Sequence, residues 1–126
     1  MENKKAILAI DDNKMQLELF QKMLDSRYNV YIVNSASNAL HFLNNNQVDL
    51  ILLDIGMPNI SGFDFLYDIR KIPSYMNVPI IIISGNSEQD FFTQAKNSSA
   101  FDVMTKPVKQ ESLVETIEKA LAAAAV

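Results

Sequence analysis

The chain alternates short apolar runs with longer segments whose apolar residues recur three and four positions apart. Three of the runs are continuously apolar, which is typical of strands covered on both faces of a parallel sheet. The pattern predicts five strands, at residues 6–10, 30–33, 49–53, 79–83 and 100–104.

Helical spacing fills the intervals between these strands. Leu17, Phe20 and Leu24 fall on one stripe, as do Leu113 and Ile117. Such stripes predict helices at residues 14–26, 37–46, 63–72, 88–97 and 110–124. Strands and helices in strict alternation predict an α/β fold, (βα)5. We expect a doubly wound parallel five-stranded sheet in the flavodoxin-like order 2-1-3-4-5.

Length and composition fit a single domain spanning residues 1–126. Apolar residues make up 48% of the chain and charged residues 21%, which is too apolar for a disordered segment. The net charge is −4 and the basic residues form no run, so we expect neither a nucleic-acid partner nor a membrane partner. The tail from about residue 122, "AAAAV", either extends the last helix or marks a truncation point or a cloning scar.

The chain contains no cysteine, which excludes disulfides, thiolate metal sites and cysteine nucleophiles. We find no signal peptide, and the apolar runs are too short to span a membrane. These features predict a cytoplasmic protein.

Polar residues follow all five predicted strands, although those after the second strand, Asn34 and Ser35, lie away from the centre of the sheet. In an open α/β sheet, ligands bind beyond the carboxyl ends of the strands, at the point where the strand order reverses. That point lies between the first and third strands for the order above. The residues delivered to this edge are Asp11, Asp12, Asp54, Ser84 and Lys106.

A count of charges indicates what this crevice holds. Three carboxylates close together repel one another, and one divalent cation plus one lysine would balance them. Because every candidate ligand is an oxygen, we expect Mg²⁺, with Mn²⁺ as an acceptable substitute. Ser84 as a hydroxyl donor and Lys106 as a cation both suit a phosphoryl group.

Asp54 is a candidate nucleophile toward phosphorus, since a carboxylate can form an acyl phosphate. Gly56 frees the backbone beyond it, so that its carbonyl can turn toward the metal. An alternative role for Asp11 or Asp12 is capping of the following helix.

The sequence contains four motifs that are spread along nearly the whole chain. They are "DD" at 11–12, "LLDIGMPNISG" at 52–62, "IIISG" at 81–85 and "TKP" at 105–107. Together they resemble the receiver domains of two-component response regulators, particularly single-domain chemotaxis and sporulation regulators.

The resemblance implies a role for each residue of the predicted site. Asp54 would be the phosphoacceptor, Ser84 the switch hydroxyl, and Lys106 a contact to the phosphoryl group. Pro107 would follow a cis peptide. The metal ligands would be Asp11, Asp12, Asp54 and the carbonyl of Gly56.

The resemblance also implies partners. The phosphoryl donor would be a histidine kinase or a histidine phosphotransfer protein. An effector would bind the face formed by the fourth and fifth strands and the fourth and fifth helices, and a phosphorylation-linked homodimer stays open. The family usually carries Tyr or Phe three residues before the lysine, where this chain has Val103. We therefore expect the phosphorylation chemistry to be retained and signal transmission to be altered.

Three alternatives compete with a phosphorylation-dependent switch. An aspartyl-phosphate phosphohydrolase needs a general acid two residues after the nucleophile, and Gly56 stands there. A flavin- or nucleotide-binding module needs a phosphate-binding loop where this chain has "DDNKMQ". A receiver-like scaffold that works without phosphorylation stays open because of Val103. We expect no catalysis beyond the domain's own phosphorylation and dephosphorylation.

Overall fold

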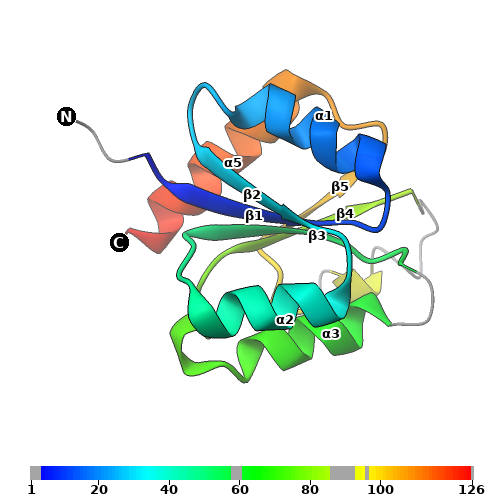
Figure 1. The fold of residues 1–126 in the computed structure, drawn as a ribbon, viewed down its shortest axis with the longest axis vertical. Helices are drawn as coiled ribbons and strands as arrows, with labels where there is room; N and C mark the ends of the chain where they lie inside the picture. Colours follow the sequence, from blue (N-terminus) through cyan, green and yellow to red (C-terminus); the bar gives the residue numbers. More distant parts are fainter. Residues whose placement is uncertain (1–3, 58–60, 86–92, 96, 126) are drawn as a thin grey trace.

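A computed structural model describes residues 4–57, 61–85, 93–95 and 97–125, and within these ranges the predicted sheet is present. Five parallel strands lie side by side in the order β2-β1-β3-β4-β5, as expected (Figure 1). Their bounds are β1 Ala6–Ile10, β2 Asn29–Val33, β3 Leu50–Asp54, β4 Ile80–Ser84 and β5 Asp102–Thr105.

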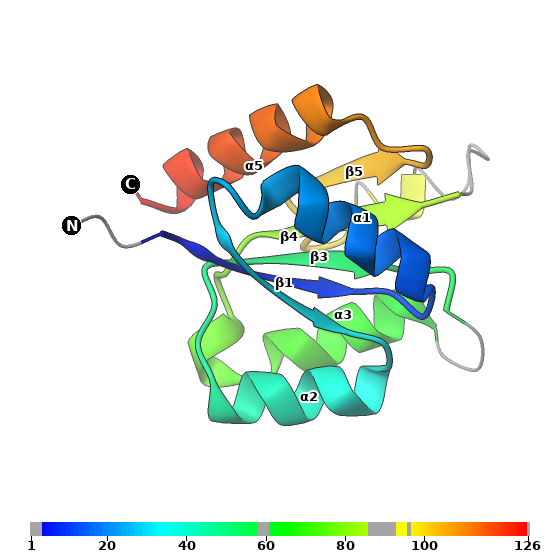
Figure 2. The ribbon, with the colours of Figure 1, turned by 45° about the horizontal axis from the view of Figure 1, so that its top comes forward.

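Helices cover both faces of this sheet, which confirms the doubly wound prediction (Figure 2). On one face lie α1 (Lys14–Leu24) and α5 (Gln110–Ala124), and on the other lie α2 (Ala36–Asn45) and α3 (Gly62–Arg70). A short 3₁₀ helix, η1 (Pro73–Tyr75), follows α3. None of the helices in the described ranges is long and apolar enough to cross a bilayer.

The alternation of side chains along each central strand divides the core into two layers. Leu8 of β1 joins the layer under α2 and α3, whereas its neighbour Ile7 joins the layer under α1 and α5. All five residues of β3 and of β4 are buried. Continuous apolar runs therefore mark strands covered on both faces, as the sequence indicates.

The fifth strand was misplaced by the sequence pattern. The prediction put it at residues 100–104, but β5 begins at Asp102 and ends at Thr105. Phe101 precedes the strand and is 42% exposed. Because β5 is an edge strand and only partly buried, hydrophobicity marks its bounds poorly. The last helix does extend into the alanine tail, whereas most of the predicted helix 88–97 lies outside the described residues.

Tyr75 of η1 joins two connections at the end of the sheet away from the predicted site. Its ring is fully buried, and its hydroxyl donates a hydrogen bond of 2.6 Å to the carbonyl of Asn46. The same hydroxyl accepts a bond of 3.1 Å from the amide of Val48. Burial raises the pKa of this phenol, and the negative charge of Asp49 adds to the shift.

We expect Tyr75→Phe to lower the free energy of unfolding by about 1–3 kcal/mol, because the buried Val48 amide loses its acceptor. The pKa of Tyr75 in the folded chain lies above its usual value of 10.0. The stability that the protonated phenol contributes is therefore lost as the pH rises from 10.0 through the folded pKa. Urea unfolding between neutral and alkaline pH measures both effects. Equal urea midpoints for Tyr75→Phe and the parent chain at neutral pH would contradict the predicted loss of stability. If the free energy of unfolding falls equally with pH in the two chains above neutrality, the predicted effect of the Tyr75 pKa is wrong.

Candidate functional site

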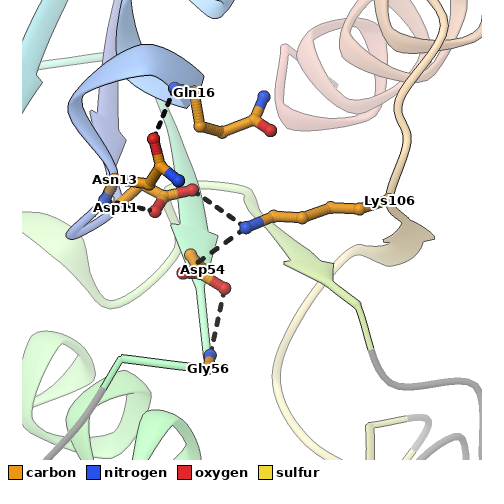
Figure 3. Close-up of polar contacts among 6 residues, drawn as sticks. All are labelled: Asp11, Asn13, Gln16, Asp54, Gly56 and Lys106. Carbon is orange, nitrogen blue, oxygen red and sulfur yellow. Dashed lines mark hydrogen bonds and ion pairs between the residues drawn. The ribbon is translucent and has the colours of Figure 1, made fainter.

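The turn between β1 and α1 carries two adjacent acids, Asp11 and Asp12, and neither of them caps the helix. Asn13 is the N-cap of α1, and its side-chain oxygen accepts a 3.1 Å hydrogen bond from the amide of Gln16 (Figure 3). Asp11 instead accepts a 2.9 Å bond from the amide of Asn13. The capping role considered for the acids thus belongs to Asn13, which leaves both carboxylates at the edge of the sheet.

Three carboxylates meet at this edge. Asp54 is the last residue of β3, next to β1 in the sheet, and is 5% exposed. Asp11 is fully buried, while Asp12 is exposed. One carboxylate oxygen from each residue lies within 4.8 Å of the others. The structure therefore brings the three predicted acids together, in an arrangement that can hold a metal ion.

Lys106 reaches this cluster from the end of β5. Its Nζ lies 3.2 Å from Oδ2 of Asp11 and 3.6 Å from Oδ2 of Asp54 (Figure 3). Its backbone amide donates a 2.7 Å hydrogen bond to the carbonyl of Ser84, which ties it to β4. The peptide between Lys106 and Pro107 is cis, as the resemblance implied. One ammonium group thus faces two of the three carboxylates.

The clustering of charges shifts the pKa of the buried carboxyl group of Asp11. Burial raises the pKa of Asp11, and the negative charge of Asp54 raises it further. The amide of Asn13 and the ammonium of Lys106 act in the opposite direction. A single lysine leaves the cluster short of positive charge, so the site favours a further cation.

Two other predicted residues lie beside the cluster. Ser84 ends β4 and is 3% exposed, one position beyond the residue that pairs with Asp54 in the sheet register. The amide of Gly56 donates a 3.0 Å hydrogen bond to Oδ1 of Asp54. No described glycine has a positive φ, so Gly56 is not needed for a left-handed backbone conformation. The role expected of the Gly56 carbonyl as a metal ligand stays a prediction.

Gly62, in the tight loop expected before the helix, also makes a close tertiary contact at the site. It opens α3, after the N-cap Ser61, and packs against the segment that follows Asp54. A Cβ at Gly62 would lie 2.1 Å from Cβ and 2.6 Å from Cα of Ile55. Only a residue without a side chain permits this approach, which fixes where the chain runs just after Asp54.

We expect Gly62→Ala to lower the free energy of unfolding by about 1–3 kcal/mol, because the Ile55 backbone must move aside. Gly85→Ala is the matched control, since a Cβ there meets nothing within 4 Å. That control should stay within about 0.5 kcal/mol of the parent chain in urea unfolding. If the two variants unfold at the same urea concentration, the close approach at Gly62 is not a constraint.

Comparison with known proteins gives this arrangement a family context. The sequence matches the family model of the response regulator receiver domain over residues 7–118. It is 32% identical over 123 residues to the 3′,5′-cyclic-nucleotide phosphodiesterase regA of Dictyostelium discoideum. It is 33% identical over 112 residues to the cell cycle transcriptional regulator CtrA of Caulobacter vibrioides. The alignments cover 94% and 88% of this chain, but only 16% and 48% of those proteins.

A solved structure gives the same picture of the fold. The CheY-like receiver domain protein of Methanospirillum hungatei superimposes with a TM-score of 0.88 at 26% sequence identity. The superposition covers 97% of each chain. The similarity of fold therefore extends over nearly the whole chain.

Proposed function

The chain belongs to the family of response regulator receiver domains, which act in two-component signalling, and from that premise we propose that Asp54 is its phosphoacceptor. The observation that carries the proposal is the placement of Lys106 between the buried acids Asp11 and Asp54. Receiver domains act with histidine kinases or histidine phosphotransfer proteins, and we propose such a phosphohistidine as the donor. The product is a phosphorylation-dependent signalling state.

The transfer is a single displacement at phosphorus. A carboxylate oxygen of Asp54 forms a bond to phosphorus as the bond between phosphorus and the donor imidazole nitrogen breaks. The electron pair of that bond stays on the imidazole, which takes up a proton. Lys106 donates a hydrogen bond to the phosphoryl group, and Asp11 holds its ammonium in place. Ser84 supplies a hydroxyl donor from the end of β4.

Asp11, Asp12 and Asp54, with the carbonyl of Gly56, would hold the metal. The donor set contains oxygen alone, which fits Mg²⁺ and also accepts Mn²⁺. When bound, the ion supplies positive charge that offsets the carboxylates and the oxygens of the transferring group. Asp12 is exposed and so leaves one side of the site open to the donor.

We propose that the output surface is the face formed by β4, β5, α5 and the helix between β4 and β5. Most of that helix lies outside the described residues. Val103 of β5 is half-buried and packs on the core layer under α2 and α3. It has no ring to move, so we propose that an effector senses this face differently from that of relatives with an aromatic residue. A phosphorylation-linked homodimer and a cytoplasmic location stay predictions.

A scaffold that works without phosphorylation is the second candidate, and Val103 is the observation that favours it. We propose that residues 1–126 form one receiver domain whose only catalysis is its own phosphorylation and dephosphorylation. A phosphohydrolase is disfavoured, because Gly56 offers no general acid two residues beyond Asp54.

Intact mass spectrometry after incubation with acetyl phosphate tests the proposal. With Mg²⁺ present we expect the mass of one phosphoryl group to be added, and hydroxylamine should remove it because it cleaves acyl phosphates. With a chelator the addition should fall to background. A phosphoryl group that resists hydroxylamine would place the modification on another side chain. No addition in either condition would favour the scaffold.

A further inference from the structure

Arg70, the last residue of α3, carries a half-buried positive charge. Its guanidinium donates to three main-chain carbonyls, those of Tyr75 at 2.8 Å, Ser99 at 2.9 Å and Val78. Its Nε donates a further bond of 3.0 Å to the hydroxyl of Ser99. Among the described residues, no carboxylate forms an ion pair with Arg70. Burial lowers the pKa of Arg70, so its surroundings disfavour the charge and would favour an anion beside it.

Arg70 lines a pocket with a volume of about 360 Å³, at the edge of the sheet where β4 and β5 begin. Two of the lining residues mark this position, because Pro79 directly precedes β4 and Phe101 directly precedes β5. The hydrogen bonds of Arg70 join α3 to the segments before both strands, so the walls of the pocket are held in place without a ligand. Pockets of this volume are typical of small-molecule sites.

The lining combines one cation with an apolar surface. Among its described residues Arg70 alone is charged, in a chain whose net charge is −4. Two large apolar side chains border the pocket, Met76 with 59% and Phe101 with 42% of its surface exposed. Opposite them lie the small side chains of Ala123 and Ala124, in the last turn of α5. The positive charge selects an anion, and the apolar lining selects an anion with an apolar portion.

Two hydrogen-bond donors remain for such an anion. A guanidinium has five N–H groups, and those of Arg70 make four bonds within the described part of the chain, which leaves one N–H on Nη2. The hydroxyl of Ser99 accepts from Nε of Arg70 and retains its own hydrogen for donation. Because Ser99 is bonded to Arg70, the two donors are neighbours in the lining of the pocket.

We propose that this pocket binds a small organic carboxylate with an apolar tail. The carboxylate accepts hydrogen bonds from Nη2 of Arg70 and from the hydroxyl of Ser99, and it supplies the negative charge that balances the guanidinium. The tail lies against Met76, Phe101 and the alanines of α5. The site does not depend on the proposed phosphoryl transfer, because it lies where the strands begin, whereas Asp54 lies where β3 ends.

NMR titration of the whole chain with hexanoate tests the proposal. We expect a dissociation constant of about 1 mM, with amide shifts concentrated at the residues that line the pocket. Hexanol keeps the tail without the charge and acetate keeps the charge without the tail, so each should bind weaker by about tenfold or more. Equal affinities for hexanoate and hexanol, or for hexanoate and hexylammonium, would overturn the proposal. The absence of pocket shifts up to about 20 mM hexanoate would also overturn it.

Ala123→Asp tests the site without removing Arg70. Ala123 is exposed and lines the pocket, so a carboxylate there should repel hexanoate and raise its dissociation constant by about fivefold or more. Ala122→Asp is the matched control, because Ala122 is exposed one position away and is not in the described lining; its constant should stay within about twofold of the parent. Equal constants in the two variants would contradict the proposed site. Arg70→Met should abolish binding in a chain that circular dichroism shows to be folded, and parent-like binding there would exclude the guanidinium as the anion's partner.

Discussion

Asp54→Asn is expected to reduce phosphoryl uptake from acetyl phosphate by at least about 100-fold. The amide that replaces the carboxylate has no anionic oxygen to attack phosphorus. It also removes one of the three negative charges of the cluster, so we expect Mg²⁺ affinity to fall by about 10–100-fold. Intact mass spectrometry measures the uptake, and titration calorimetry measures the metal affinity.

Asp68→Asn is the matched control, because it makes the same chemical change at an exposed carboxylate of α3. That variant should take up the phosphoryl group and bind Mg²⁺ as the parent chain does. Uptake that survives in Asp54→Asn would remove Asp54 from its proposed role. Loss of uptake in both variants would show a general effect of lowering the negative charge.

The fold was predictable where burial and sequence pattern coincide. The central strands β1, β3 and β4 are covered on both faces, so they appear in the sequence as unbroken apolar runs. The edge strand β5 is half-covered, and its start was misplaced by two residues relative to Ala100. Tyr75 was not singled out, because its hydroxyl joins Asn46 and Val48, which are far from it along the chain.

The carboxylate cluster was predictable because parallel strands end at a common edge. Asp11 follows β1 and Asp54 ends the neighbouring strand β3, so strand order alone brings them together. The capping residue was not predictable, since Asn and Asp cap helices equally well and Asp11, Asp12 and Asn13 are consecutive. The close approach of Gly62 to Ile55 depends on tertiary packing, and the sequence carries no signal for it beyond a glycine in a loop.

Lys106→Met should lower the free energy of unfolding of the metal-free chain by about 1–3 kcal/mol, because the buried Asp11 carboxylate loses its cation. The Lys106 side chain is 26% exposed, so water screens part of the loss. Mg²⁺ should restore most of this stability, since a dication supplies the missing charge. Phosphoryl uptake should still be slowed by about 100-fold, because one donor to the phosphoryl group is gone.

Lys71→Met separates this effect from the loss of a surface charge. Lys71 pairs with Asp68 at 3.8 Å with both side chains largely in solvent, and such a pair contributes little to stability. Urea unfolding with a chelator and with Mg²⁺ should therefore show a metal-dependent difference for Lys106→Met alone. If both variants respond to the metal as the parent chain does, Lys106 does not compensate the carboxylates. A normal rate of uptake in Lys106→Met would show that its ammonium does not touch the transferring group.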